Sequence, residues 1–320
     1  MLKWTTNDIP SQVGKRAVIT GATGGLGYES ALALAVAGAE VVLTGRNADK
    51  GNAALMRIHA RHPAAQIRYA HLDLASLQSV TDFAGRFVSE YDGLDVLINN
   101  AGVMMPPKRK VTADGFELQF GTNYLAHFAL TAHLLPALSR ARQAHVVNLS
   151  SLAHRRGAIH FEDLQWEHHY RPWGSYGQSK LAMLMFAFEL QRRSDASQWG
   201  LLSTAAHPGY ARTDLISNGP GTDGWLQKIG LLFQPLMSQS AADGALPTLF
   251  AATAPEAKGG AYYGPRGFYE MKGPVAEAFV APQAKDTAVA GRLWDVSEQL
   301  THVRWPTALP GRGPCTRGAR

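Results

Sequence analysis

Tyr176 and Lys180, four residues apart, are the side chains in this sequence best suited to proton transfer. They stand at the start of a helical stretch that runs to about residue 193, and residues four apart share one face of a helix. A free tyrosine has a pKa of about 10 and is a poor base at neutral pH, but a neighbouring cation favours the phenolate. The pair predicts a general acid/base at Tyr176, although this spacing by itself is common and usually structural.

Further polar residues follow predicted strands. Ser150 and Ser151 end one strand, and the run Asn99-Asn100-Ala101-Gly102 ends another. Open α/β sheets bind their ligands at the carboxyl ends of their strands, so these groups should lie near one another. Asn123 is expected to face the same site from a helix over residues 115–135.

A glycine-rich turn over residues 20–27 separates the first predicted strand from the first predicted helix. Glycines let the backbone approach a pyrophosphate, and a helix N-terminus offers free N–H groups and a positive dipole end. The spacing Gly-x3-Gly-x-Gly differs from the Gly-x-Gly-x-x-Gly fingerprint, and a tight strand–helix connection is the alternative. Its context predicts a dinucleotide site that includes Gly21, Thr23, Gly25, Leu26 and Gly27.

Arg46 follows Gly45 at the end of the second predicted strand. An acidic residue there would bind the ribose hydroxyls of the adenosine and repel a 2′-phosphate. Because arginine pairs bidentately with phosphate, Arg46 predicts NADPH/NADP+ as the cofactor in preference to NADH. The alternative is a surface arginine at the start of a helix.

Short apolar runs alternate with helical patterns along the chain. Strands are predicted over residues 17–20, 41–44, 67–72, 94–98, 145–149 and 201–206. Alternating strands and helices of this length form a parallel sheet covered on both faces. We therefore expect an α/β fold, a doubly wound parallel sheet of Rossmann type, in a single catalytic domain over residues 1–305, with a disordered tail over residues 306–320.

Composition narrows the class of protein. The 320 residues are 46% hydrophobic and 18% charged, as in an ordinary globular protein. Several of the basic residues behind the net charge of +6 lie in the tail and in a loop at residues 108–110. Because charges dispersed in such segments are usually solvated, we expect no nucleic-acid partner. The single cysteine, Cys315, allows no intrachain disulfide, and no metal site is expected. Without a signal peptide or an apolar span, we expect a cytoplasmic protein with no membrane partner.

The motifs of this sequence, and their order along the chain, resemble those of the short-chain dehydrogenase/reductase superfamily. The resemblance runs from about Lys15 to Leu300. The residues that carry the resemblance are Thr20-Gly-x3-Gly-x-Gly27, Asp73, Asn99-Asn-Ala-Gly102, Asn123, Ser151, Tyr176-x3-Lys180 and Pro208-Gly209-x3-Thr213. The resemblance implies an NAD(P)-dependent oxidoreductase acting on alcohol or carbonyl groups.

The resemblance also implies catalytic roles. Tyr176 is the general acid/base, and Lys180 lowers its pKa and holds the nicotinamide ribose. Ser151 hydrogen-bonds the substrate oxygen, and Asn123 anchors a water in the proton relay. The choice of Ser151 over Ser150 rests on the resemblance alone.

The remaining family positions concern the cofactor. Asp73 lies by the adenine, Asn100 by the adenosine side, and Thr213 by the carboxamide, with Pro208 and Gly209 also in contact. Within the superfamily the chain resembles the retinol-dehydrogenase and protochlorophyllide-reductase-like branch. The residues that carry this second resemblance are Asn148-Leu-Ser-Ser-Leu-Ala-His154, Tyr176-Gly-Gln-Ser-Lys-Leu-Ala182 and His207-Pro-Gly209. Protochlorophyllide reductases use an active-site cysteine, and the only cysteine here is Cys315, so light-driven C=C reduction is not expected.

The leading hypothesis is an NADPH-preferring enzyme for a medium-to-large apolar carbonyl or alcohol, with residues 216–240 as an apolar lid. The alternative is a nicotinamide-binding redox sensor of the same fold without turnover. His154 is expected to line the pocket entrance, whereas His168 and His169 should be exposed. Apolar residues of the Tyr176 helix should pack in the core or in a homodimer interface.

Overall fold

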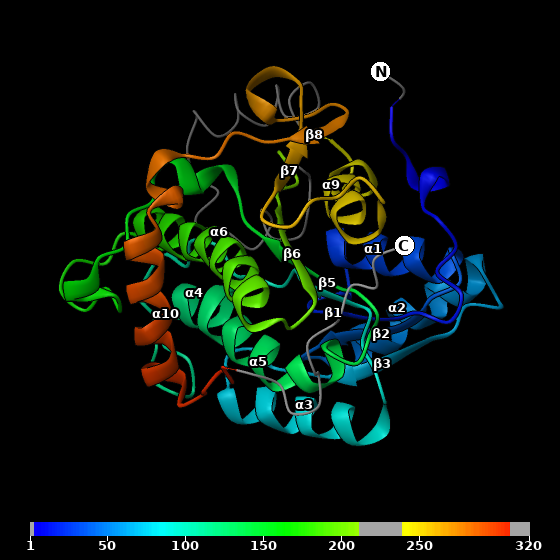
Figure 1. The fold of residues 1–320 in the computed structure, drawn as a ribbon, viewed down its shortest axis with the longest axis horizontal. Helices are drawn as coiled ribbons and strands as arrows, with labels where there is room; N and C mark the ends of the chain where they lie inside the picture. Colours follow the sequence, from blue (N-terminus) through cyan, green and yellow to red (C-terminus); the bar gives the residue numbers. More distant parts are fainter. Residues whose placement is uncertain (1–2, 211–238, 308–320) are drawn as a thin grey trace, which may run out of the picture.

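The computed structural model of the protein describes residues 3–210 and 239–307. Its centre is an eight-stranded sheet in the order β3-β2-β1-β4-β5-β6-β7-β8 (Figure 1). The strands are β1 (Arg16–Ile19), β2 (Glu40–Gly45), β3 (Ile67–His71), β4 (Val96–Asn99), β5 (Ala144–Leu149), β6 (Leu201–Ala206), β7 (Tyr262–Pro265) and β8 (Val275–Glu277). The chain reverses its direction of travel across the sheet between β1 and β4, which are neighbours, and open α/β sheets bind ligands at such a point.

The predicted α/β fold with a doubly wound sheet is confirmed. All six predicted strands are present, and β1 to β7 pair in parallel. At one edge of the sheet, β8 runs antiparallel to β7. These two short strands escaped prediction because β7 contains glycine and proline, which are uncharacteristic of strand interiors.

Helices cover both faces of the sheet (Figure 1). The structure contains α1 (Gly25–Val36), α2 (Ala48–Arg61), α3 (Leu77–Glu90), α4 (Leu118–Phe120), α5 (Ala126–Leu138), α6 (Pro172–Ser197), α9 (Ala241–Thr253) and α10 (Thr287–Thr301). One apolar core lies between the sheet and α1, α2 and α9. The other lies between the sheet and α3, α5, α6 and α10.

The helix that carries Asn123 differs from its predicted bounds. Gly115 lies in a turn with a φ of 86°. The helix begins instead at α4, where the carboxylate of the buried Glu117 accepts hydrogen bonds from the N–H groups of Gln119 and Phe120. It widens to a π-helical turn over Gly121–Leu125 before it continues as α5. Asn123 therefore sits in the π turn, a local feature often found at functional sites.

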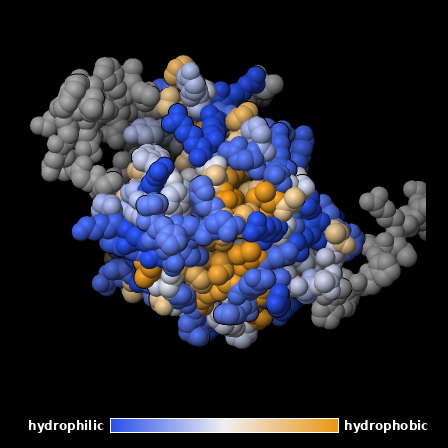
Figure 2. Space-filling model, turned by 90° about the vertical axis from the view of Figure 1, so that its left-hand side faces the viewer, coloured by the Kyte–Doolittle hydropathy of each residue, from blue (hydrophilic) through white to orange (hydrophobic). Residues whose placement is uncertain are grey.

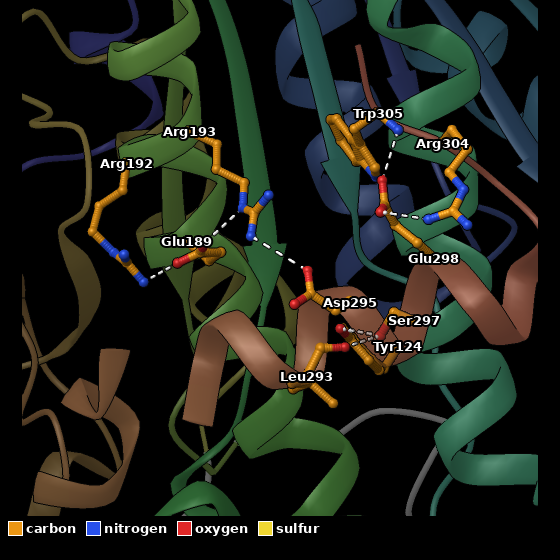
Figure 3. Close-up of polar contacts among 10 residues, drawn as sticks. All are labelled: Tyr124, Glu189, Arg192, Arg193, Leu293, Asp295, Ser297, Glu298, Arg304 and Trp305. Atoms are coloured by element: carbon orange, nitrogen blue, oxygen red, sulfur yellow. Dashed lines mark hydrogen bonds and ion pairs between the residues drawn. The ribbon is translucent and has the colours of Figure 1, made fainter. Parts of the chain in front are cut away.

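Helix α10 covers the outer side of α6 and α5. The ring centroids of Phe128 and Trp294 are 5.0 Å apart, and Trp199 stacks on Trp305 at 5.3 Å. Figure 3 shows the polar contacts around this packing, among them the 2.7 Å hydrogen bond between Tyr124 and Ser297. The apolar residues Leu181, Met183, Leu184 and Phe186 of α6 are buried in the core of this one chain, and Phe188 is partly buried against it.

Ion pairs lie at the edge of the packing between α6 and α10. The nearly buried carboxylate of Glu189 pairs with both Arg192 and Arg193, and Arg193 reaches Asp295 of α10 at 3.9 Å (Figure 3). Figure 2 looks onto the side of the molecule that carries α10, where apolar side chains gather among hydrophilic ones. Among residues 3–210 and 239–307, no helix combines the length and the apolar character needed to cross a membrane. Residues 308–320 of the predicted tail lie outside the described residues.

Candidate active site

A cavity of about 360 Å³ opens at the carboxyl ends of the central strands. The glycine turn, the Asn100 run, the end of β5, the first turns of α6 and the segment after β6 all contribute to its wall. The lining residues are Gly21, Thr23, Gly24, Gly25, Leu26, Gly27, Lys50, Asn100, Ala101, Gly102, Leu149, Ser150, Tyr176, Lys180 and Pro208. Residues predicted from separate motifs thus meet in one space.

The glycine turn is braced by Asn100. The Asn100 Nδ2 atom donates hydrogen bonds to the carbonyl oxygens of Thr20 at 2.7 Å and Gly21 at 3.3 Å. A Cβ atom on Gly27 would lie 2.6 Å from that Nδ2 and 2.7 Å from the Gly21 oxygen, closer than atoms can approach. Only glycine fits here, so the backbone forms an open cradle of the kind that admits a pyrophosphate. The main contribution of Asn100 to the cavity is therefore to hold the glycine turn in place through these hydrogen bonds.

His127 joins the glycine turn to Asn123, and sequence analysis missed it. Its Nε2 lies 2.9 Å from Thr20 Oγ1, and its Nδ1 lies 2.9 Å from the main-chain oxygen of Asn123. Because a carbonyl only accepts, Nδ1 carries the hydrogen and Nε2 accepts from the threonine hydroxyl. Burial lowers the pKa of His127 to about 4, so the ring is neutral. The four-residue spacing from Asn123 was the signal that could have revealed it.

Asn123 connects the segment after β4 to α6 through hydrogen bonds. Its Oδ1 accepts from Val103 N at 2.7 Å, and its Nδ2 donates to Val103 O and to Ser179 Oγ, both at 3.0 Å. Both hydrogens of Nδ2 and one lone pair of Oδ1 are thus engaged by protein groups.

Tyr176 lies in the first turns of α6, which begins at Pro172 with the proline in the first helical turn. The residue is 6% exposed. Burial raises the pKa of the Tyr176 phenol to about 12, and a hydrogen bond with Ser151 acts in the opposite direction. The neighbouring Ser150 also lines the cavity, but its hydroxyl donates to the Lys180 carbonyl oxygen at 2.7 Å. The two serines are thus distinguished by geometry.

Lys180 shares the helix face of Tyr176, as the spacing predicted. Its Nζ donates to the Leu149 carbonyl oxygen at 3.0 Å and lies 5.9 Å from the centroid of the tyrosine ring. Burial lowers the pKa of Lys180 to about 8. The expected lowering of the Tyr176 pKa by Lys180 is not found in this structure, because the ammonium points at the end of β5 and burial has the larger effect on the phenol.

Of the two cations near the end of β2, Lys50 lines the cavity and Arg46 does not. Arg46 is exposed directly after β2, at the N-terminal end of α2. Lys50 lines the cavity from the first turn of α2, where its N–H is bound by the capping side chain of Asn47. Sequence analysis missed Lys50, although its position four residues after Arg46 was a signal. Asp73 follows β3, and its Oδ1 accepts from Ala75 N at 2.9 Å.

The segment after β6 brings Pro208 to the cavity, with Gly209 next to it at a φ of 62°. Thr213 lies outside the described residues, as do residues 216–238 of the predicted lid. His154 does not line a pocket entrance: it is fully buried, with its ring edge-on to Tyr262 at 5.4 Å. The reason is its 2.7 Å contact with the Ser151 carbonyl oxygen, which turns the ring inward.

His168 and His169 are exposed, as predicted. In the part of the chain that the structure describes, no three histidine, cysteine or acidic side chains are grouped so as to hold a metal ion.

Known proteins are similar to this chain in sequence and in fold. The family model described as short chain dehydrogenase matches residues 15–220. Human retinol dehydrogenase 13 is 39% identical over 299 residues, which cover 92% of this chain and 86% of that protein. Mouse polyprenol dehydrogenase is 38% identical over 298 residues, covering 92% and 85%.

Solved structures agree. A crystal structure of a putative uncharacterized protein from Mycobacterium paratuberculosis is 42% identical with a TM-score of 0.78, covering 95% of this chain and all of that one. A putative short chain dehydrogenase from Escherichia coli CFT073, crystallised with NADPH, is 25% identical with a TM-score of 0.62, covering 80% and 97%. The chain therefore belongs to the short-chain dehydrogenase family, in its retinol-dehydrogenase-like branch, and is an NAD(P)-dependent oxidoreductase acting on alcohol and carbonyl groups.

Proposed function

We propose that this protein interconverts a ketone or aldehyde and an alcohol on a medium-to-large apolar substrate, with a preference for NADPH. The observation that carries the proposal is the buried Tyr176 phenol in the cavity that the glycine cradle also lines, with Ser151 close enough to lower the pKa of the phenol. When bound, the nicotinamide supplies or accepts the hydride.

The protein's own residues handle the proton and the orientation. Tyr176 exchanges a proton with the substrate oxygen, and Ser151 donates a hydrogen bond to that oxygen. Lys180 holds the nicotinamide ribose, and the cradle from Gly21 to Gly27 holds the pyrophosphate. Asn123 anchors the relay water. Support for this assignment comes from the engagement of Ser150 with α6, which leaves Ser151 as the hydroxyl beside the phenol.

The preference for NADPH rests on two cations at the end of β2. Arg46 is exposed and Lys50 lines the cavity, so both are available to a 2′-phosphate. No acidic residue follows β2 at this point to bind the ribose hydroxyls of NADH. The Escherichia coli relative bound to NADPH shows the cofactor class in a similar fold, without fixing the preference of this chain.

The apolar substrate class rests on exposed aromatic side chains, one of which contacts Tyr176. Trp173 is 65% exposed, and its ring lies edge-on to that of Tyr176 at 6.3 Å. Phe268 and Tyr269, also exposed, form a T-shaped pair on the loop before β8. Large exposed apolar groups near a site favour apolar ligands. The relatives named retinol and polyprenol dehydrogenases point to the same class.

Turnover with a panel of apolar aldehydes and alcohols, using NADPH and NADH separately, tests the proposal. Tyr176→Phe should reduce kcat by about 10²-fold or more while leaving the Kd for NADP+ nearly unchanged. Tyr91→Phe, a tyrosine beyond the end of α3 and outside the cavity, is the matched control. Wild-type turnover in Tyr176→Phe would overturn the assignment. Tight NADP+ binding without turnover on any substrate would favour the redox sensor instead.

A further inference from the structure

The loop between β7 and β8 carries a carboxylate that the reaction outlined above does not use. Glu270 ends the short 3₁₀ turn Phe268–Glu270. Its φ is 59° and that of Tyr269 is 49°, both in the left-handed region. Non-glycine residues enter this region at an energetic cost and persist there when surrounding contacts hold them. The position of Glu270 is therefore enforced by its partners.

Glu270 joins three segments that are far apart in the sequence. Its Oε2 accepts from Arg155 Nη2 at 2.6 Å and lies 3.2 Å from His207 Nε2. Its Oε1 accepts from the N–H of Phe279 at 2.8 Å. Burial would raise the pKa of Glu270, but the contacts with His207, Phe279 and Arg155 outweigh it and lower the pKa below its usual value. The group is a carboxylate at neutral pH.

His207 is fully buried and holds the segment after β6. Its Nδ1 accepts a hydrogen bond from Gly209 N at 3.1 Å. Burial lowers the pKa of His207, so the ring is neutral and carries a single hydrogen. Since Nδ1 accepts, that hydrogen must be on Nε2, which lies 3.2 Å from the Glu270 carboxylate in a charge–dipole contact and not in an aligned hydrogen bond. Gly264 makes room for this arrangement, because a Cβ there would lie 1.9 Å from Nε2.

We propose that Glu270 is a positioning residue for cofactor binding, acting through the tautomer of His207. Its carboxylate selects the form with hydrogen on Nε2, which leaves Nδ1 able to hold the Gly209 N–H and so to fix Pro208 at the cavity wall. The inference rests on the proposed cofactor contacts of Pro208 and Gly209.

The same carboxylate also reaches the catalytic side of the cavity. Arg155 belongs to the 3₁₀ turn Leu152–Arg156, in which the Ala153 N–H donates to the Ser151 side chain. Glu270 thus ties the turn that follows Ser151 to the segment that contacts the cofactor. Among the described residues, Glu270, Arg155, His154 and the ring of Tyr262 lie around His207. The Glu270 side chain therefore holds the turn after Ser151 and the segment after β6 at a fixed distance from each other.

Cofactor affinity of Glu270→Ala, measured by titration of the full chain with NADP+, tests the inference. The Kd should rise about five- to tenfold, which corresponds to the loss of about one hydrogen bond. Glu277→Ala removes an exposed carboxylate on β8 that pairs with Lys258, and it should leave the Kd within about twofold. Glu270→Gln keeps an acceptor for Nε2–H and should recover most of the affinity.

A double variant separates positioning from general loss of structure. His207→Asn places an amide oxygen near the position of Nδ1, so Gly209 keeps an acceptor that needs no tautomer selection. In that background, Glu270→Ala should change the Kd by less than about twofold. A full five- to tenfold effect there would show that Glu270 acts by another route and would overturn the proposal.

The tautomer itself can be read by nitrogen NMR of histidine-labelled protein, with the His207 signals assigned by their loss in His207→Asn. Wild type should show hydrogen on Nε2, and Glu270→Ala should shift the population toward Nδ1–H. Hydrogen on Nδ1 in the wild type would overturn the inference regardless of cofactor. A wild type that bound neither NADP+ nor NAD+ would instead overturn the proposed function, and the cofactor role of Glu270 with it.

Discussion

The Nζ atom of Lys180 lies 5.9 Å from the centroid of the Tyr176 ring and is hydrogen-bonded to the end of β5. Both groups are buried, so the pKa of the phenol is raised to about 12 and that of the ammonium is lowered to about 8. In this arrangement Tyr176 holds its proton at neutral pH, as the proposed donation to a carbonyl oxygen requires.

Opposite pH dependences are expected for the two directions of reaction. Reduction needs the protonated phenol, so its kcat/KM should be constant near neutrality and decline above about pH 8, where Lys180 loses its charge. Oxidation needs a phenol that has lost its proton, so its kcat/KM should rise with pH through the same range. Initial rates in both directions over about pH 6 to 9 check this. An oxidation rate that fell as the pH rose would contradict it.

Removal of the two cations at the end of β2 should change the choice of cofactor. Arg46→Ala and Lys50→Ala should each raise the KM for NADPH by about tenfold, because each loses a charged contact with the 2′-phosphate worth about 1.4 kcal/mol. The KM for NADH should change little, since NADH lacks that phosphate. Arg61→Ala, an exposed cation at the far end of α2, serves as the control. Equal effects on both cofactors would argue against a 2′-phosphate site.

Gly27→Ala should damage the cofactor cradle. The added Cβ would meet Asn100 and the Gly21 oxygen inside 3 Å, so the turn or the asparagine must move. We expect the Kd for NADP+ to rise by about tenfold or more, a loss of at least about 1.4 kcal/mol. Gly85→Ala on the exposed face of α3 meets nothing within 4 Å and should stabilise the protein by about 0.5–1 kcal/mol without changing the Kd. An unchanged Kd in Gly27→Ala would exclude this turn as the pyrophosphate site.

His127 should make the fold sensitive to acid. Its pKa is about 4 in the folded protein and about 6.5 in the unfolded chain, so the unfolded chain binds the extra proton first as the pH falls. Stability is therefore lost between about pH 6.5 and pH 4. His127→Gln should lose about 2 kcal/mol less unfolding free energy than wild type between pH 7 and pH 5. Urea unfolding at the two pH values measures this, with the exposed His168→Gln as the control.

Local patterns in the sequence determined the order of strands and helices through β6. Their signals are short-range: apolar runs, the Asn47 cap, and the glycine turn between strand and helix. The motif residues could also be assigned to one edge of the sheet, because parallel strands place all their carboxyl ends together. The order of motifs was enough to predict the family and the reaction class.

Tertiary structure decided which side chains meet. The pairing of Ser151 with Tyr176, the contact of His127 with Thr20, and the inward turn of His154 all join residues from different elements. So do the contacts of Glu270, which lies in a loop that no periodicity marks. Spacing along the chain constrains neighbours on one helix or strand, whereas these contacts depend on how the elements pack. The sequence determined the reaction class and its candidate residues, and the packing decided the hydrogen bonds and the burial that set their protonation.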